Sequence, residues 1–79
     1  MGIFAEVKKA ICTVQPGVDE SKIASDTVLR DDLEISSLGM VELALALEDA
    51  FGLYLPDNEM EGIVTVGDIV SLIESKLRE

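Results

Sequence analysis

The stretch EISSLGMVEL, residues 34–43, places two adjacent serines at the start of a predicted helix. A serine just before the first helical turn is a preferred cap, because its hydroxyl accepts a backbone N–H that lacks a partner within the helix. That role needs one serine, so the second hydroxyl lies unused beside N–H donors and the positive end of the helix dipole. A phosphodiester attached to it would be favourably placed. The pair therefore predicts one helix cap and one candidate attachment site.

The helix that follows should run from about Ser37 to Phe51, with Gly52 as its stop. Helical spacing predicts two apolar faces. The face expected to enter the core contains Met40, Leu43, Ala44, Leu47, Ala50 and Phe51. The opposite face carries Leu38, Val41 and Leu45, interleaved with Glu42, Glu48 and Asp49. Apolar side chains rimmed by acids are typical of a protein-docking surface, although these three could also pack under the preceding connection.

The rest of the chain predicts an all-α fold, because no segment alternates in the manner of a strand. We expect a small four-helix bundle with three longer helices, a short third helix and a long first connection. The first helix covers residues 3–14, ends at Pro16-Gly17 and has a stripe of Phe4, Val7, Ile11 and Val14. Residues 17–36 then form the connection, which should contain a turn or short helix and be pinned by Ile23, Val28, Leu29 and Leu33.

Two further helices are expected after Gly52. A short one should begin at Asp57, directly after a proline, and continue to Glu61. The last should open at Thr65, because Asp68 follows three residues later in a capping-box pattern. Its predicted buried stripe consists of Val66, Ile69, Val70, Ile73 and Leu77.

A chain of 79 residues is expected to form a single domain, residues 1–79. It contains no histidine and one cysteine, Cys12, so hydrolase triads, zinc centres and intramolecular disulfides are not expected. We therefore predict a protein that is not an enzyme and holds no metal, with Cys12 as a small half-buried apolar residue. No apolar run is long enough to span a membrane, so the default expectation is a soluble, cytoplasmic monomer.

Charge is distributed unevenly along the chain. The net charge is −10, and residues 31–75 contain eleven acidic side chains but no lysine or arginine. Such a surface repels nucleic-acid phosphates and anionic lipid, and it attracts basic protein surfaces. We therefore expect protein partners, and neither nucleic-acid binding nor membrane insertion.

One acidic segment also overlays the spacing of a calcium-binding EF-hand loop. The matching positions are Asp57, Glu59, Glu61, Gly62 and Asp68. Glutamate stands where aspartate or asparagine is preferred at two positions, and Asp68 is too short for the usual bidentate ligand. A calcium-responsive helix pair is therefore the least favoured of the hypotheses.

Several short motifs, in this order, resemble those of acyl carrier proteins over nearly the whole chain. They are Leu-x-x-Ser-Ser-Leu at 33–38, Val-Glu-Leu at 41–43, Leu-Glu-Asp-Ala-Phe-Gly at 47–52, Leu-Pro-Asp at 55–57 and Ile-Val-Thr-Val at 63–66. In that family a serine that precedes leucine carries a 4′-phosphopantetheine arm, whose terminal thiol holds acyl groups as thioesters. The matching residue in this sequence is Ser37.

The resemblance also implies partners. A phosphopantetheinyl transferase would load Ser37 from coenzyme A, with magnesium serving the transferase. Acyl-transferring and chain-elongating enzymes with basic surfaces would dock on the second helix. The residues expected to contact these partners are Ser36, Leu38, Val41, Glu42, Leu45, Glu48, Asp49 and Glu61. The acyl chain would lie between helices, against residues such as Leu47, Ile63 and Ile73.

Two positions depart from the family pattern, since Ser36 replaces the usual aspartate and Glu34 the usual glycine. Ser36 can cap the helix but brings no negative charge toward a basic modifying enzyme, which leaves the choice of transferase open.

The strong negative charge favours a carrier for fatty-acid-type biosynthesis, with carriers of polyketide, lipid or aminoacyl groups as alternatives. An unmodified acidic interaction module of the same fold is the other alternative.

Overall fold

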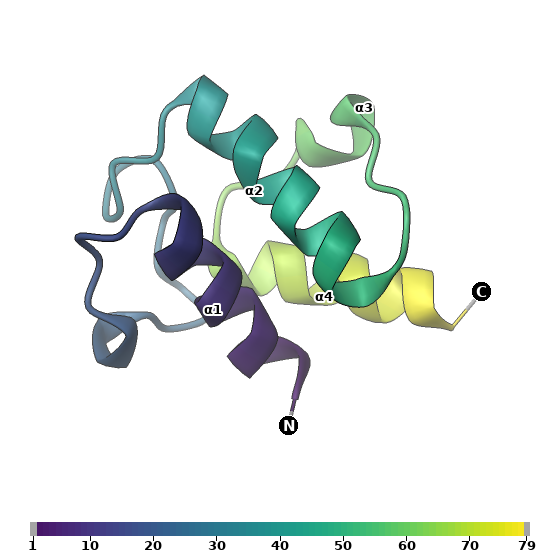
Figure 1. Cartoon of the computed structure of the whole chain (residues 1–79), viewed down its shortest axis with the longest axis horizontal. Helices are drawn as coiled ribbons and strands as arrows, with labels where there is room; N and C mark the ends of the chain where they lie inside the picture. Colours follow the sequence, from purple (N-terminus) through teal and green to yellow (C-terminus); the bar gives the residue numbers. More distant parts are fainter. Residues whose placement is uncertain (1, 79) are drawn as a thin grey trace.

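The computed structural model describes residues 2–78, apart from the side chain of Asp57, and its regular elements over this range are all helices. They are α1 (Ile3–Val14), the short 3₁₀ helix η1 (Glu20–Lys22), α2 (Ser37–Phe51), α3 (Asp57–Met60) and α4 (Val66–Leu77). Figure 1 shows the three long helices packed together, with α3 beside α2. The predicted four-helix bundle is confirmed, although α3 ends one residue earlier than expected. No helix in the described range is long and apolar enough to cross a membrane.

The apolar stripes predicted for the three long helices meet in one core. Helix α1 contacts both α2 and α4. The side chains that are fully buried among them include Val7, Ile11, Leu43, Leu47, Ile69 and Ile73. Two predicted core positions are wrong, because Ala50 and Leu77 are exposed. Both lie in the last turn of their helix, where fewer neighbouring side chains cover the stripe.

The long connection from α1 to α2 contains η1, as expected of a segment of this length. Of its four predicted apolar pins, Ile23 and Leu29 are buried and Val28 and Leu33 are half-buried. Ile35, which was not among the predicted pins, is also buried. The connection therefore contributes side chains to the core and is not a free loop.

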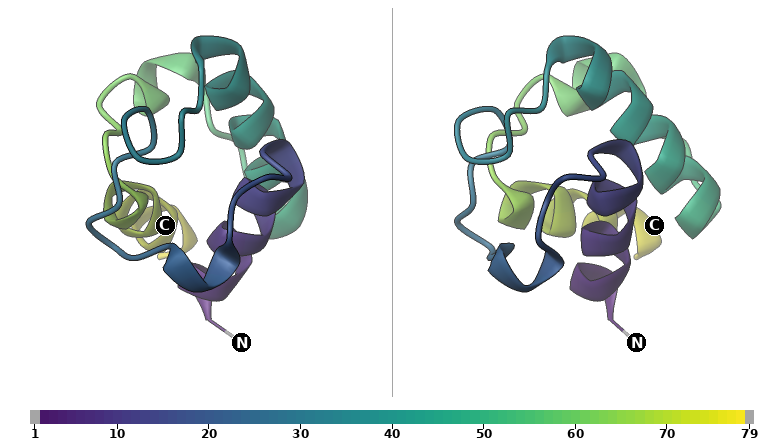
Figure 2. Two further views of the ribbon diagram at one scale, coloured as in Figure 1. Left: turned by 90° about the vertical axis from the view of Figure 1, so that its left-hand side faces the viewer. Right: turned by 60° about the vertical axis from the view of Figure 1, so that its left-hand side comes forward.

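Backbone hydrogen bonds also tie this connection to the loop that precedes α4. Three of them join residues 25–29 to residues 64–67 in antiparallel order, with N···O distances of 2.7–3.0 Å. A Cβ added to Gly67 would lie 2.9 Å from the carbonyl oxygen of Ser25, so the close approach depends on glycine. Figure 2 shows the connection running from α1 past the start of α4 to α2. This pairing fixes the segment that leads into the two serines.

The N-terminus of α4 is closed by a reciprocal capping box, as predicted. Thr65 Oγ1 accepts the N–H of Asp68 at 3.2 Å, and Asp68 Oδ2 accepts the N–H groups of Thr65 and Val64, both at 3.0 Å. The pKa of Asp68 is held below its ordinary value by these hydrogen bonds. The backbone N–H of Thr65 has the largest effect and that of Val64 the next largest. The pKa falls because hydrogen bonds donated to a carboxylate favour its charged form.

We expect Asp68→Ala to lower the free energy of unfolding at neutral pH by about 1 kcal/mol, as other lost helix caps do. Because folding depresses the pKa of Asp68, the contribution is present above the unfolded-state value of about 3.9 and is lost as the pH falls through the folded-state value. The stability difference between wild type and variant should therefore shrink below about pH 3.9. Urea denaturation across this range measures the difference.

The matched control is Asp26→Ala, which removes an exposed carboxylate that makes no hydrogen bond in the described part of the chain. It should change stability little at any pH. An equal loss in both variants, or a loss for Asp68→Ala that persists unchanged in acid, would contradict the capping role of Asp68.

Candidate functional site

Ser36 caps α2, as the sequence predicted. Its Oγ accepts the N–H of Gly39 at 3.1 Å, and its backbone is extended, as is usual for an N-cap residue. Gly39 is buried, and a Cβ added there would lie 2.8 Å from Cγ2 of Ile35. The missing side chain therefore lets Ile35 pack against the first turn of α2, which fixes how the chain enters the helix.

Ser37 is the first residue of α2, and its side chain is exposed. Since the cap uses the hydroxyl of Ser36, the hydroxyl of Ser37 is left for another group. In the described part of the chain that group is Arg30, whose Nη2 donates to Ser37 Oγ at 3.3 Å. Arg30 was not among the predicted site residues. The sequence could have drawn attention to it, because Arg30 directly precedes residues 31–75, which contain no lysine or arginine.

Glu34 adopts a left-handed backbone conformation, with φ of 56°, two residues before Ser36. A side chain in this conformation costs about 1–2 kcal/mol, because its Cβ crowds the carbonyl oxygen. The side-chain amide of Gln15 donates to the carbonyls of Leu33 and Glu34, at 3.2 and 3.4 Å. These bonds hold the turn against the end of α1. The left-handed turn is a physical reason why the glycine that the family resemblance implies for this position would suit the backbone better than glutamate.

Glu34→Gly is expected to raise the free energy of unfolding by about 0.5–1 kcal/mol, the relief of left-handed strain less the greater freedom of glycine in the unfolded chain. Glu34→Ala is the matched control, because it removes the same negative charge but keeps the Cβ atom. Urea denaturation of the two variants and the wild type measures the effect. A gain of the same size in the alanine variant would mean that the charge, and not the backbone conformation, is responsible.

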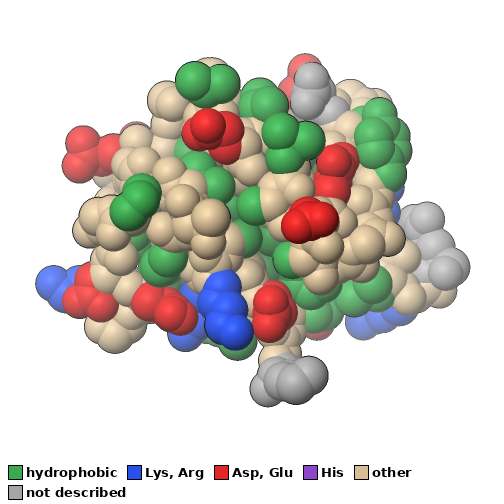
Figure 3. Space-filling view, in the orientation of Figure 1, with side chains coloured by type: hydrophobic (Ala, Val, Ile, Leu, Met, Phe, Trp, Pro, Cys, Tyr) green, Lys and Arg blue, Asp and Glu red, His purple; other side chains and the backbone are tan. Residues whose placement is uncertain are grey.

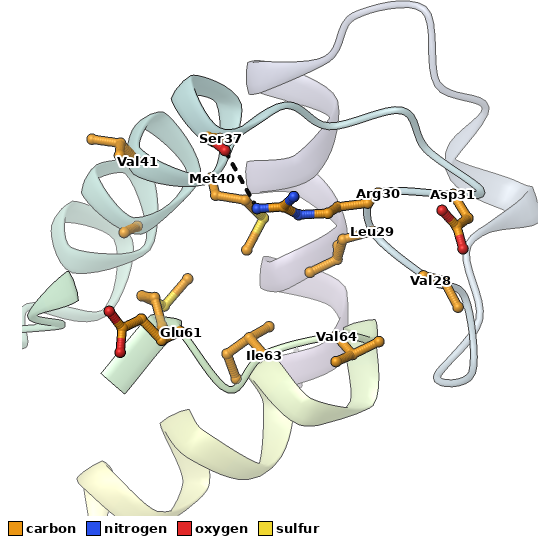
Figure 4. Close-up of a pocket in the computed structure, with 12 residues that line it drawn as sticks. Val28, Leu29, Arg30, Asp31, Ser37, Met40, Val41, Glu61, Ile63 and Val64 are labelled. Atoms are coloured by element: carbon orange, nitrogen blue, oxygen red, sulfur yellow. Dashed lines mark hydrogen bonds between the residues drawn. The ribbon is translucent and has the colours of Figure 1, made fainter. Parts of the chain in front are cut away.

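A pocket of about 470 Å³ lies next to Ser37, between α2, α3 and the loops that precede α2 and α4. Figure 4 shows Ser37 and Arg30 on one side of it and Glu61 and Ile63 on another. Its mostly apolar lining consists of Val28, Leu29, Arg30, Asp31, Ser37, Met40, Val41, Ala44, Met60, Glu61, Ile63 and Val64. This size and lining are typical of sites for small apolar ligands.

Only one of the three residues that the resemblance implied for the acyl chain lines this pocket. Ile63 lines the pocket, but Leu47 and Ile73 do not, because both are fully buried on the core stripes of their helices. On α2 the pocket is lined instead by Ser37, Met40, Val41 and Ala44.

The outer face of α2 combines exposed apolar and acidic side chains. Leu38, Val41 and Leu45 are 69, 46 and 60% exposed, so the alternative that they pack under the connection is wrong. Glu42 and Asp49 are exposed and lie on the same face, at helical spacings of three, four and seven residues. Figure 3 shows carboxylates and apolar side chains intermixed over the region of α2.

The other predicted contact residues differ in how much of each side chain is available. Glu48 is half-buried and its Oε2 accepts the N–H of Leu55 at 2.8 Å, so it holds the connector that follows α2. The hydroxyl of Ser36 is engaged in the cap. Glu61 is exposed beside the pocket, which brings it near Ser37 although 24 residues separate them in sequence.

The EF-hand-like set of acidic residues is not assembled into a calcium loop. Glu59 instead pairs with Lys76, whose Nζ lies 2.7 and 2.6 Å from its two carboxylate oxygens, and Asp68 caps α4. The side chain of Asp57 lies outside the described part of the structure. Among the described side chains, no three potential ligands gather in a metal-binding group.

Cys12 is half-buried on α1, as predicted. Burial, together with Glu20 and Asp19, raises the pKa of its thiol. Since the thiolate is the reactive form of cysteine, this environment makes Cys12 a poor nucleophile.

Known proteins resemble this chain over most of its length. The family model described as "Phosphopantetheine attachment site" matches residues 5–73. An acyl carrier protein of Thermotoga maritima is 47% identical over 75 residues, which are 95% of this chain and 91% of that protein. An acyl carrier protein of Prochlorococcus marinus is 42% identical over 74 residues, 90% of this chain and 92% of that one. A solved structure from Mycobacterium tuberculosis, described as an acyl carrier protein, has a TM-score of 0.86 and 25% identity over 95% of this chain and 99% of its own.

Proposed function

Since the chain belongs to the acyl carrier protein family, we propose that Ser37 is the residue that bears its 4′-phosphopantetheine arm. The observation that carries the proposal is the division of roles between two serines. Ser36 Oγ is bonded to the first turn of α2, whereas Ser37 Oγ is exposed and takes no part in the cap. Proteins of this family are carriers and not catalysts. In the proposal, residues 1–79 form one carrier domain that acts as a monomer in the cytoplasm.

The surroundings of Ser37 fit a phosphodiester. Ser37 begins a helix of 15 residues, where unpaired N–H groups and the helix dipole favour an anion. Its exposure lets a transferase reach the hydroxyl, and the neighbouring pocket offers an apolar wall. When bound, the arm supplies a terminal thiol that holds an acyl group as a thioester. Cys12 is unsuited to that role, because its thiol is half-buried with a raised pKa.

Loading requires the hydroxyl of Ser37 to act as the nucleophile. Its Oγ attacks the phosphorus of coenzyme A that bears pantetheine, a new Oγ–P bond forms, and the phosphoanhydride bond breaks to release adenosine 3′,5′-bisphosphate. The hydroxyl proton passes to a base of the transferase. No base of this chain is in place for it, since the hydrogen-bond partner of Ser37 Oγ in the described structure is a guanidinium.

We propose the outer face of α2 as the docking surface for partner enzymes. Its apolar centre is Leu38, Val41 and Leu45, and its acidic residues are Glu42 and Asp49. Ser36 and Glu61 lie beside this surface. Glu48 adds negative charge to it, although its Oε2 accepts a hydrogen bond from Leu55. The proposed partners are a phosphopantetheinyl transferase and the acyl-transferring and chain-elongating enzymes of fatty-acid-type biosynthesis. Because exposed carboxylates surround the apolar centre, complexes with these partners should form fast and have low affinity.

The pocket beside Ser37 is the proposed site for part of the acyl chain. Its apolar walls include Met40, Ala44, Met60 and Ile63, and its position next to Ser37 places it within reach of a flexible arm. An acyl chain that enters it leaves water, which is favourable in proportion to the apolar area buried.

Intact-mass measurement tests the proposed function. Protein incubated with coenzyme A, magnesium and a phosphopantetheinyl transferase should gain the mass of one arm per chain. The loaded protein should then accept one acyl group that hydroxylamine removes, as expected of a thioester. No gain with transferases of different specificity, while partner binding persists, would support the unmodified interaction module instead.

A further inference from the structure

Among the described residues that line the pocket beside Ser37, Arg30 has the only basic side chain. Its Nη2 donates to Ser37 Oγ at 3.3 Å, and Oγ is the atom to which the phosphorus of an arm would be bonded. Figure 4 shows the side chain extending from its loop toward Ser37. The oxygens of a phosphate on Oγ lie one bond beyond the phosphorus, so they would fall within reach of the guanidinium.

The backbone on either side of Arg30 is fixed. Leu29 is buried, and its N–H and its carbonyl are both bonded to other backbone groups, at 3.0 and 3.1 Å. Asp32 closes the turn, because its side chain accepts the N–H of Val28 at 2.8 Å and its own N–H donates to Val28 at 2.9 Å. The side chain of Arg30 therefore extends from a well-held base.

The guanidinium of Arg30 has donors that the protein itself does not use. The ion pairs found among residues 2–78 are Lys9–Glu6 and Lys76–Glu59, and neither involves Arg30. In Figure 4 the carboxylate of the adjacent Asp31 points away from the guanidinium. An arginine presents five N–H donors in a planar fork that matches two phosphate oxygens. One side-chain hydrogen bond, to Ser37, occupies this fork in the described structure.

From this arrangement, and resting on the proposed modification of Ser37, we infer that Arg30 binds the phosphate of the arm and directs the arm along the pocket. Two donors of the guanidinium hold the non-bridging oxygens, beside the N–H groups of the first turn of α2. The positive charge also offsets the repulsion that the phosphate meets from Asp31 and Glu61, which line the same pocket. Arg30 is thus a positioning residue for the loaded carrier.

The test compares loaded wild type with loaded Arg30→Gln, Arg30→Lys and Lys22→Gln. Lys22→Gln is the charge-matched control, because Lys22 is exposed in the same connection but does not line this pocket. Intact mass first establishes one arm per chain, and circular dichroism establishes that each variant is folded. The readout is the ³¹P chemical shift of the phosphodiester, recorded at low salt and at about 1 M salt, where the Debye length is only about 3 Å.

We expect Arg30→Gln to move the ³¹P resonance toward the position that wild type reaches at high salt, and to remove most of its salt dependence. Arg30→Lys should give an intermediate shift, because lysine keeps the charge but lacks the planar fork. Lys22→Gln should match wild type.

Identical resonances in fully loaded wild type and Arg30→Gln would overturn the inference. Slower loading of Arg30→Gln with an unchanged resonance would overturn it too, because Arg30 would then serve the transferase and not the arm. Failure of wild type itself to load would instead contradict attachment at Ser37, so the two failures are distinguishable.

Discussion

Ser37→Ala is expected to abolish loading by a phosphopantetheinyl transferase, because it removes the one hydroxyl at the start of α2 that the cap does not use. After prolonged incubation with coenzyme A and the transferase, the intact mass should remain that of the unmodified chain. The fold should persist, since Ser37 is exposed and its side chain is bonded to an exposed Arg30. Urea denaturation should therefore show a change in stability within about 0.5 kcal/mol.

Ser36→Ala is the matched control for this prediction, since it removes the adjacent hydroxyl. It deletes the acceptor for the N–H of Gly39 and should lower the free energy of unfolding by about 1 kcal/mol. The gain of one arm should nevertheless remain. If Ser36→Ala blocked loading in a folded protein while Ser37→Ala did not, the roles assigned to the two serines would be wrong.

Glu42→Lys combined with Asp49→Lys is expected to slow acyl transfer to a partner enzyme with a basic docking surface, by on the order of 10- to 1,000-fold at low ionic strength. Both carboxylates are exposed and take part in neither ion pair of the described structure. The two substitutions therefore reverse the charge on the outer face of α2 without breaking an ion pair. Glu48 is left unchanged, because its bond to Leu55 would confound docking with folding. Kinetics with the loaded carrier as the varied substrate measures the effect.

The matched control for the charge reversal is Asp26→Lys combined with Glu74→Lys. It changes the net charge by the same amount at exposed positions in the connection and on α4. We expect a much smaller effect on transfer, and the gap between the two double variants should narrow as salt rises. Equal rates for the two double variants would count against the outer face of α2 as the docking surface.

Most helix boundaries could be predicted because adjacent residues encode them, although α3 ends one residue before the predicted Glu61. Gly52 has a left-handed φ of 65°, as a stop at the end of α2 requires, and Thr65 and Asp68 cap each other across three residues. Core membership was less predictable at the edge of a stripe. Ala50 is exposed because burial there depends on how far the neighbouring helices extend, which is a property of the tertiary packing.

The candidate site was predictable only where its contacts are local. The cap by Ser36 follows from a bond across three residues, whereas the choice of Ser37 rested on family resemblance. Arg30 reaches Ser37 because residues 25–29 fold back onto residues 64–67, a pairing that no periodicity in the sequence reveals. The pocket depends on the same pairing, so its lining residues could not be chosen from helical spacing alone.

Attachment of the arm to Ser37 is tested most directly by locating it within one peptide. A glutamate-specific protease that cuts the loaded protein after Glu34 and Glu42 releases residues 35–42, which contain both adjacent serines. Tandem mass spectrometry of this peptide then assigns the added mass to one residue. We predict that the arm is found on Ser37 and that Ser36 is unmodified. An arm on Ser36, or on a peptide outside residues 35–42, would contradict the proposed attachment site.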